Sequence, residues 1–267
     1  ALGTSSTYEL TSYFESDKYQ QTAANSGNPD PTTYAIGSNL SITPFIHGLV
    51  ADYAFDNPAS GVGAITTDSS GWGNNGTLED TTSTGTGPAQ TSTPNCVSGS
   101  CYSFDGVDDY ISTGNIPTSG FSSNQEISIL DWVYINSNNS SQGTPSYDNG
   151  FFHVMVNTSG VTVYLNVDNS WTSPSDGPLS ASYSIAQDAW HLVAFTYNQN
   201  HLWTIYVDGN KAGSTVFGSG LYPGGSINMG DAYGGSTLFG GLLDDIRIYN
   251  VALTQAQVQA IYNAEKS

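Results

Sequence analysis

Apolar and polar residues alternate in short runs along most of the chain, and turns rich in Gly, Asn, Asp and Ser separate these runs. A period of two over about four to eight residues is typical of β-strands that bury one face. The turn Val207-Asp208-Gly209-Asn210 suits a tight hairpin because it supplies positive φ angles, and residues 197–201 join the preceding pair of strands. The predicted strands are 49–55, 101–104, 110–112, 127–135, 151–156, 161–167, 191–197, 202–207, 211–216, 226–229 and 242–249.

Many short strands joined by such turns predict an all-β fold, a two-sheet antiparallel sandwich. One short helix is expected at the C-terminal end, because Thr254 and Gln257 have the spacing of a capping box. Val258, Ile261 and Tyr262 follow at helical spacing and give this helix a single apolar stripe. We therefore expect the helix to lie against the sandwich.

Residues 1–47 carry a different pattern from residues 48–267. Short alternating stretches at 7–10 and 39–42 flank a turn-rich segment at 25–31, and a strand of this kind needs a partner sheet. We expect 1–47 to be an N-terminal arm, a donor-strand-like extension that adds a strand to a neighbouring subunit. A strand that completes its own domain and a linker left from a longer precursor are the alternatives.

The charge balance excludes several classes of partner. The chain has 23 acidic and 4 basic residues, which gives a formal net charge of −19. Such a charge repels phosphate backbones and anionic lipids, so we expect no nucleic-acid partner. No apolar run approaches the ~18 residues of a membrane span, so no membrane insertion is expected. Hydrophobic residues make up 37% of the chain, which is enough for a sizeable core.

The two cysteines, Cys96 and Cys101, enclose the sequence Val-Ser-Gly-Ser. Gly99 lets the chain turn back, so a hairpin disulfide forms easily, and closing so small a loop contributes about 2 kcal/mol. A redox or metal pair would more often have two intervening residues and a basic neighbour. A disulfide implies an extracellular or cell-surface location. Glycosylation sequons fit the same location and occur at Asn39, Asn75, Asn138, Asn139 and Asn157.

Four segments in a fixed order resemble the laminin-G-like, concanavalin A-like lectin/glucanase jelly-roll family. They are GLVADYAFD at 48–56, DSSGWGNNGT at 68–77, SFDGVDDYI at 103–111 and LDDIRIYNVALT at 243–254. WHLV at 190–193, together with the hairpin at 207–209, is similar to the central strands of the family. The resemblance covers about residues 48–264 and implies that the sandwich is a concanavalin A-like jelly roll.

One strand departs from the family pattern. Asp131 lies in the predicted strand 127–135, where the family has a small apolar residue. We expect its side chain to face solvent. A buried carboxylate there would have to be paired, hydrated or bound to a cation, because isolated burial costs several kcal/mol.

The resemblance also implies a structural calcium ion that ties an early loop to the last strand. The motif match carries Asp68 and Asp244 over as ligands, and Asp56, which ends the first strand, is a further candidate. Oxygen-rich loops with few basic residues suit such a hard cation. The alternative is that these aspartates form turns by accepting local backbone N–H groups. Turn formation is also the expected role of Asp105, Asp108 and Asp109.

The last strand carries two aspartates in a row. Strict alternation places Asp244 on one face with Leu242, Ile246 and Ile248. Asp245 then shares the other face with Arg247, which is the single arginine of the chain. We therefore expect Asp245 to pair with Arg247.

No catalytic pattern is found in the sequence. Glucanases of this fold carry Glu-x-Asp-x-x-Glu on one strand, which sets two carboxylates about 5–5.5 Å apart for retaining chemistry. Neither this pattern nor a Gly-x-Ser-x-Gly elbow occurs. Exposed aromatic rings bind sugars by stacking on their apolar faces. Trp72, Trp171 and Tyr233 fall in predicted loops and are therefore candidate ligand-binding residues; turn packing or subunit contact is the alternative for them.

Together these observations predict a non-catalytic, extracellular structural or adhesive protein. A self-assembling surface or filament subunit ranks first, because an arm that adds a strand to the next copy gives open head-to-tail contacts. A secreted calcium-dependent carbohydrate-binding module is the alternative, and a glycan-degrading enzyme is a remote third. The expected partners are other copies of the chain through the arm, and glycans or surface proteins.

Overall fold

The computed structural model divides into two compact units, Ala1–His47 and Gly48–Ser267. In the first unit, β1 (Glu9–Tyr13) and β2 (Thr33–Gly37) pair antiparallel with each other and form a two-stranded sheet. The predicted stretch 7–10 overlaps β1, and 39–42 lies outside the described residues. The structure describes residues 9–13, 33–37, 48–82, 85–92, 96–115, 126–136, 143–148, 152–157, 159–165, 177–181, 183, 185–216, 226–231 and 238–266.

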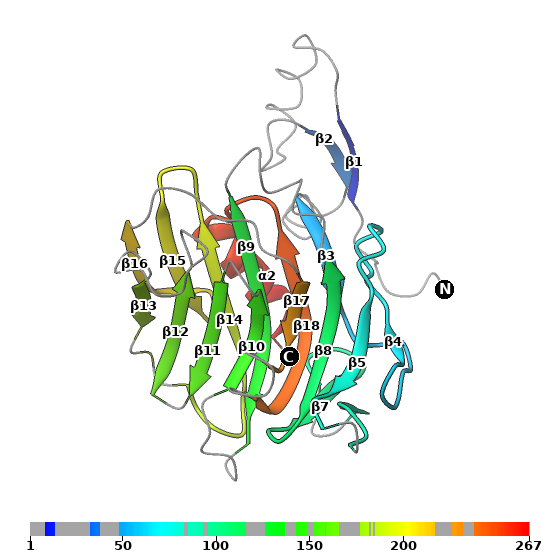
Figure 1. Cartoon of the computed structure of the whole chain (residues 1–267). Coiled ribbons are helices and arrows are strands. Elements are labelled where there is room, and N and C mark those ends of the chain that lie inside the picture. Colours follow the sequence, from blue (N-terminus) through cyan, green and yellow to red (C-terminus); the bar gives the residue numbers. More distant parts are fainter. Residues whose placement is uncertain are drawn as a thin grey trace. The chain divides into compact units, whose positions relative to one another are not determined.

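The second unit is an antiparallel sandwich of two sheets, as predicted (Figure 1). The first sheet contains, in spatial order, β13 (Gly177–Ala181), β12 (Gly160–Leu165), β11 (Phe152–Asn157), β10 (Gly143–Asp148), β17 (Ser226–Met229), β8 (Asp109–Asn115), β5 (Gly76–Asp80) and β4 (Ile65–Thr66). The second contains β16 (Asn210–Val216), β15 (Leu202–Val207), β14 (Trp190–Tyr197), β9 (Ile127–Ile135), β18 (Gly240–Tyr249), β7 (Cys101–Asp105) and β6 (Ala89–Thr91), with β3 (Leu49–Tyr53) beside β18.

The hydrophobic core lies between the two sheets. Alternate residues of a strand face the same side, and in β9 the residues of one phase belong to this core. Both predicted hairpins are confirmed, since β14 pairs with β15 and β15 with β16. The core residues of the central strands include Ile127, Ile129, Val133 and Ile135 of β9, Val193, Phe195 and Tyr197 of β14, and Val154 and Val156 of β11.

Helix α2 (Gln255–Glu265) covers the outer face of the second sheet, behind the strands in Figure 1. The predicted capping box is confirmed, because Thr254 accepts from the backbone of Gln257 while the Gln257 side chain accepts from the backbone of Thr254. Tyr262 stacks on Trp132 with ring centroids 5.7 Å apart. Trp132 lies on the face of β9 opposite to the core residues of this strand. The helix that packs on Trp132 therefore lies outside the sandwich. In the described part of the chain, no helix has the length and apolar character needed to cross a membrane.

Strand β18 contains a β-bulge. Asp244 stands opposite Trp132 of β9 and Arg247 stands opposite Leu130, so β18 has one extra residue between these pairs. Asp245 adopts a φ of 43° there. A bulge of this kind bends the strand and changes which residues share a face.

The bulge corrects the predicted faces of this strand. Leu243, Ile246 and Ile248 belong to the core between the sheets, whereas Leu242 is buried outside that core. The predicted grouping of Leu242 and Asp244 with Ile246 and Ile248 is therefore wrong. Strict alternation cannot anticipate one extra residue, which shifts the phase of every position after it.

The structure also corrects the prediction for the side chain of Asp131. Its side chain is 1% exposed, so the prediction that it faces solvent is wrong. It shares the phase of the core residues Ile129 and Val133, and it stands opposite Val193 of β14. The carboxyl group therefore lies among the core side chains.

Candidate functional site

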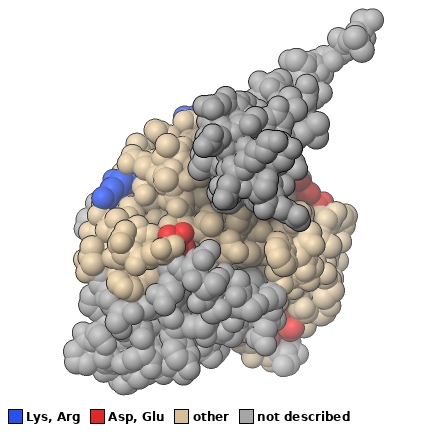
Figure 2. Space-filling model, turned by 90° about the horizontal axis from the view of Figure 1, so that it is seen from above, with Lys and Arg blue, Asp and Glu red and all other residues tan. Residues whose placement is uncertain are grey.

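Several aspartates lie inside the second unit. Burying a carboxylate is costly unless donors or a countercharge compensate it, so the partners of these groups decide what each region can do. Figure 2 shows one face on which most of the described residues are uncharged and the acidic residues stand apart. The buried aspartates of the described residues are Asp80, Asp108, Asp109, Asp131, Asp231, Asp244 and Asp245.

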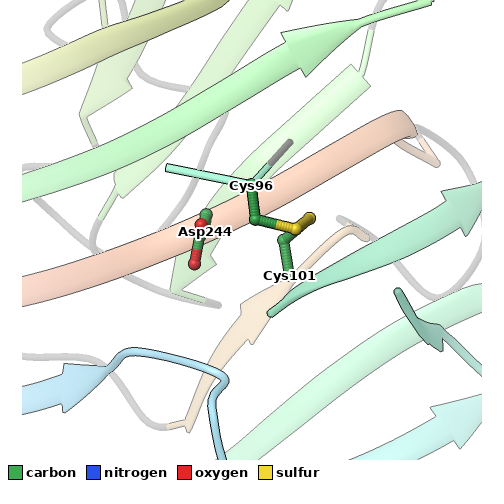
Figure 3. A group of neighbouring side chains, drawn as sticks. All are labelled: Cys96, Cys101 and Asp244. Carbon is green, nitrogen blue, oxygen red and sulfur yellow. A yellow bond between two sulfur atoms is a disulfide. The ribbon is translucent and has the colours of Figure 1, made fainter. Parts of the chain in front are cut away.

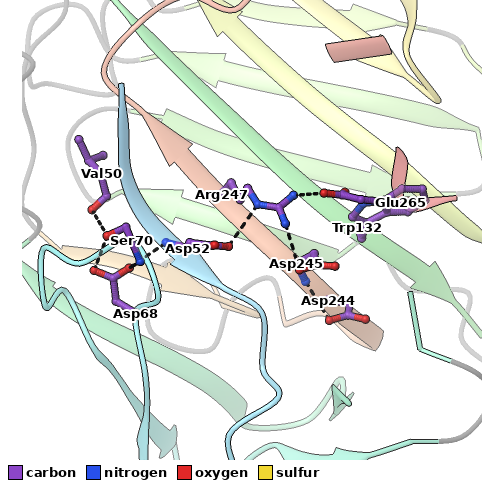
Figure 4. Close-up of polar contacts among 9 residues, drawn as sticks. All are labelled: Val50, Asp52, Asp68, Ser70, Trp132, Asp244, Asp245, Arg247 and Glu265. Atoms are coloured by element: carbon purple, nitrogen blue, oxygen red, sulfur yellow. Dashed lines mark hydrogen bonds and ion pairs between the residues drawn. The ribbon is translucent and has the colours of Figure 1, made fainter. Parts of the chain in front are cut away.

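Arg247 contacts three carboxylates from different parts of the fold (Figure 4). Its Nε lies 3.2 Å from Oδ1 of Asp52 in β3, and its Nη2 lies 3.3 Å from Oδ1 of Asp245. Its Nη1 contacts Oε1 of Glu265 at the end of α2. The predicted pair of Asp245 and Arg247 is therefore confirmed. We call these four residues the Arg247 network; it ties β3 and α2 to β18.

The electrostatics of this network keep the guanidinium charged. Burial by itself lowers the pKa of Arg247, but Glu265, Asp245 and Asp52 outweigh burial and raise it. Burial raises the pKa of Asp52, although the neighbouring guanidinium opposes this shift. The network thus places one guanidinium among three carboxylates, and burial raises the pKa of Asp245 to about 7 although Arg247 opposes this shift.

Asp68 organises the loop between β4 and β5 (Figure 4). Its Oδ1 accepts the backbone N–H groups of Asp52 at 2.9 Å and Ser70 at 2.8 Å. Its Oδ2 accepts the Ser70 hydroxyl at 2.8 Å and the Asn74 N–H at 2.9 Å. Four bonds use about all the lone pairs that a carboxylate offers. Asp68 thus forms a turn and attaches its loop to the β3 strand of the Arg247 network.

Asp244 binds the loop that the disulfide closes (Figure 3). The predicted disulfide joins Cys96 and Cys101, whose Cα atoms are 5.6 Å apart. Asp244 is 0% exposed, and its Oδ2 accepts the N–H of Ser98 at 3.2 Å. Burial and the neighbouring Asp245 raise the pKa of Asp244. This carboxyl group therefore serves as an internal anchor for the loop.

Asp56 binds the same loop. Its Oδ1 accepts the N–H of Ser100 at 2.8 Å. A side chain at Gly99 would collide with the Asp56 carboxylate, so this close approach requires glycine. Asp56 and Asp244 therefore share a structural task, the positioning of the loop between the cysteines.

Asp80, Asp105, Asp108 and Asp109 meet where β5 and β7 end and β8 begins, and we call them the four-aspartate cluster. The hydroxyl of Thr82 lies 2.9 Å from Oδ1 of Asp80 and 2.7 Å from Oδ2 of Asp108. Asp105 accepts two backbone N–H groups of its own turn at 2.7 and 3.3 Å, which confirms its predicted turn role. Burial, followed by the charges of its three neighbours, raises the pKa of Asp109 to about 6.

The predicted calcium ligands are not brought together. Among the described residues, two groups of three side chains are close enough to share one ion: Cys96, Cys101 and Asp244, and Asp105, Asp108 and Asp109. The cysteines of the first group form a disulfide, so they are not thiolate ligands. Asp56, Asp68 and Asp244 do not form such a group, and their oxygens bind backbone donors. Calcium binding stays a prediction.

The other predicted site residues are partly described. Trp72 is 67% exposed, and its Nε1 donates to the carbonyl of Leu49 at 3.0 Å, which fixes its ring. Asn75 is exposed, whereas Asn157 is half-buried in β11. The remaining candidates lie outside the described residues: Trp171, Tyr233, Asn39, Asn138 and Asn139.

The sequence did not single out an aromatic cavity on the outer face of the second sheet. It has a volume of about 420 Å³ and lies beside the C-terminal end of α2. Trp132 and Trp190 were not among the candidate ligand-binding residues of the sequence. A signal was present, because both have the opposite phase to the core residues of their strands. The cavity is lined by Val97, Trp132, Trp190, Tyr262, Glu265 and Lys266.

Comparison with known protein families identifies the second unit. The model of the concanavalin A-like lectin/glucanases superfamily, laminin G type, matches residues 105–259. The match spans more than half of the chain. The chain belongs to this superfamily. No curated protein matches the sequence significantly.

Solved structures with the same fold have low sequence identity. Domain 4 of the extracellular GH43 arabinanase AbnA from Geobacillus stearothermophilus, in complex with arabinotriose, has a TM-score of 0.58 at 22% identity, over 80% of this chain and 98% of that one. The botulinum neurotoxin D/C binding domain has a TM-score of 0.61 at 13% identity, over 82% of this chain and 52% of that one. The binding domain of Paraclostridial Mosquitocidal Protein 1 reaches 0.57 at 17% identity, over 81% and 52%. This chain spans about half the length of both toxin binding domains.

Proposed function

We propose that this protein is a non-catalytic extracellular binding protein that recognises neutral glycans through its concanavalin A-like domain. The observation that carries the proposal is the match to nearly the whole of an arabinanase domain whose structure contains arabinotriose. A shared fold does not dictate function, so this step is an analogy. The disulfide adds support for an extracellular location.

The described carboxylates support a binding role over a catalytic one. A glycosidase needs one carboxylic acid and one carboxylate that both reach the substrate. Asp68 is saturated by donors of its own loop and of β3, and Asp244 is fully buried against the disulfide loop. Asp245 and Glu265 are engaged by Arg247. These four groups hold the fold together, and Glu265 also lines the aromatic cavity, where one carboxylate by itself is not a catalytic pair.

The test is a glycan array probed with the full chain, followed by calorimetric titration of the sugars that bind. We expect binding to neutral oligosaccharides, and repeating the array in a chelator examines the predicted calcium dependence. Incubation with the polysaccharide of the best-binding sugar should release no reducing ends. Silence across the array would contradict the proposal, and steady release of reducing ends would contradict the absence of catalysis.

A second candidate function is self-assembly into a surface layer or filament through residues 1–47. It is supported by the separate unit that these residues form, with strands β1 and β2 paired to each other. In the sheet order of the described strands, β16 ends the second sheet, and most of its residues are exposed. An exposed edge strand can accept a strand from another copy. Deleting residues 1–40 should abolish polymers seen by electron microscopy while the sandwich stays folded; unchanged assembly would contradict this role.

A further inference from the structure

Four segments that are distant in the sequence meet at the aromatic cavity on the outer face of the second sheet. Val97 comes from the disulfide loop, Trp132 from β9, Trp190 from β14, and Tyr262 from α2. The volume of about 420 Å³ falls within the range of small-molecule sites, about 300–1,000 Å³. The cavity is therefore large enough for a ligand and is built by tertiary contacts.

The aromatic rings of the cavity are held in place by their neighbours. Trp132 stacks on Tyr262 at an interplanar angle of 23°, and its Nε1 donates to Oε2 of Glu265 at 2.7 Å. Trp190 meets Tyr134 at a centroid distance of 5.5 Å and an angle of 60°. Trp190 is half-buried, so part of its ring surface is open toward the cavity. Rings that are already fixed lose little entropy when a ligand binds.

Two charged groups complete the wall of the cavity. Glu265 is oriented by Trp132 and Arg247, and its carboxylate retains acceptor capacity beyond these two bonds. The Nζ of Lys266 lies 4.7 Å from the centre of the Tyr262 ring and is a donor. The cavity thus combines aromatic surface, one acceptor and one donor within a small volume.

This combination selects the chemical class of the ligand. An anion would be repelled by Glu265 and by the net charge of −19. A cation would be attracted by Glu265 but repelled by Lys266, whose ammonium already lies over the Tyr262 ring. A purely apolar ligand would strip water from both charged groups without replacing their hydrogen bonds. A neutral sugar satisfies all the surfaces, because its C–H face stacks on a ring while its hydroxyls donate to Glu265 and accept from Lys266.

We propose that this cavity binds a neutral sugar residue, with Trp190 as the stacking platform and Glu265 and Lys266 as hydrogen-bonding partners. The inference rests on the proposed glycan recognition and adds the place and the chemistry of the site. The proposed site does not include Trp72, the exposed aromatic residue in the loop between β4 and β5.

The experiment titrates the full chain with arabinotriose, xylotriose and cellotriose, and follows binding by calorimetry and tryptophan fluorescence. Trp190→Ala should weaken binding at least about tenfold, or about 1.4 kcal/mol. Val97→Trp should have a similar effect, because the larger side chain fills the cavity without removing a ring. Lys266→Ala should weaken binding a few-fold. Val216→Ala, at an exposed position of β16, is the control and should bind as the unaltered chain does, and Trp72→Ala tests the loop aromatic as the competing site.

The outcomes separate the two proposals. If no trisaccharide binds the unaltered chain, glycan recognition fails and this site fails with it. If binding survives both Trp190→Ala and Val97→Trp, or is lost only in Trp72→Ala, the cavity is not the site although the proposed function stands. Thermal unfolding of each variant reports its folding. Should Trp190→Ala unfold, Val97→Trp and Lys266→Ala decide, since neither removes a ring that packs on the sheet.

Discussion

The Arg247 network and the four-aspartate cluster place the same kind of side chain in opposite electrostatic surroundings. In the network, one buried guanidinium lies among Asp52, Asp245 and Glu265, so positive charge is supplied by the chain itself. In the cluster, the described contacts of the carboxylates are to a threonine hydroxyl and backbone N–H groups. Burial raises the pKa of an aspartate in both regions: to about 7 at Asp245, where Arg247 opposes the shift, and to about 6 at Asp109, where three neighbouring aspartates add to it. The two regions thus teach that burial alone does not set the cost of an aspartate.

The largest expected effect comes from removing the internal cation. Arg247→Met leaves three carboxylates without their countercharge, and breaking a buried pair in this way costs about 3–5 kcal/mol. The melting temperature should fall by about 6–20 °C in a domain of this size. Lys211→Met is the matched control, because it removes the same charge from an exposed position on β16. A decrease no larger than that of the control would show that the network is not stabilising.

The next effect concerns Asp68, which joins its loop to β3. Asp68→Ala removes the acceptor of four hydrogen bonds and should lower the free energy of unfolding by about 2–3 kcal/mol. Asp68→Asn keeps one oxygen and should cost less. Denaturant unfolding measures both values, with the exposed Asp188→Asn as the control for the change in charge. Equal costs for the Ala and Asn variants would contradict the account by hydrogen bonds.

Chelation separates the two roles considered for Asp68. If this residue acts by forming a turn, the stability difference between the unaltered chain and Asp68→Ala should persist in excess chelator. If it acts as a calcium ligand, the chelator should remove most of the difference by destabilising the unaltered chain alone. We expect the difference to persist, because all four hydrogen bonds come from groups of the chain.

A smaller effect is expected at the four-aspartate cluster. The Thr82 hydroxyl lies within hydrogen-bond distance of both Asp80 and Asp108. Thr82→Val therefore removes the hydroxyl that contacts these two carboxylates. The loss should be about 1 kcal/mol in denaturant unfolding. Thr82→Ser keeps the hydroxyl and should restore most of the stability. If the valine variant is as stable as the unaltered chain, the hydroxyl does not hold the cluster.

A further effect at the four-aspartate cluster is a gain in stability that depends on pH. Asp109 titrates near 3.9 in an unfolded chain and at about 6 in the folded one. Between these values the folded state holds the proton more tightly, so stability falls as the pH rises from about 4 to about 6 and stays lower above that. Asp109→Asn removes this loss, and its melting temperature should exceed that of the unaltered chain at pH 7 and match it near pH 4. Asp188→Asn, at an exposed position, is the control for the change in charge.

Some of the fold could be predicted because its signals are local. The strands at 127–135, 202–207 and 226–229 were predicted with the bounds that the structure has. Strands β2, β4, β5, β6, β10 and β13 were missed; the residues of β5, β6 and β10 are mostly polar or small and show no clear alternation. Such strands are held by pairing with their neighbours, which the sequence of the strand itself does not reveal.

The candidate site was predicted less well than the fold. The pairing of Asp245 with Arg247 was found because the residues are two positions apart, but Glu265 and Asp52 also reach that guanidinium from distant elements. The aromatic cavity brings Val97 next to residues of β9, β14 and α2. The spacing of residues in the sequence does not predict that these distant segments come into contact.

By itself, the sequence determined many of the strands, the hairpins, the capped helix and the disulfide, since each depends on residues that are close neighbours in the chain. The tertiary structure alone decided the bulge at Asp245, the burial of Asp131, the complete Arg247 network and the cavity beside α2. These depend on how two sheets and a helix settle against one another. A single extra residue in β18 changes which side chains meet there. Only the pairing of β18 with β9 in the folded protein shows where this extra residue lies.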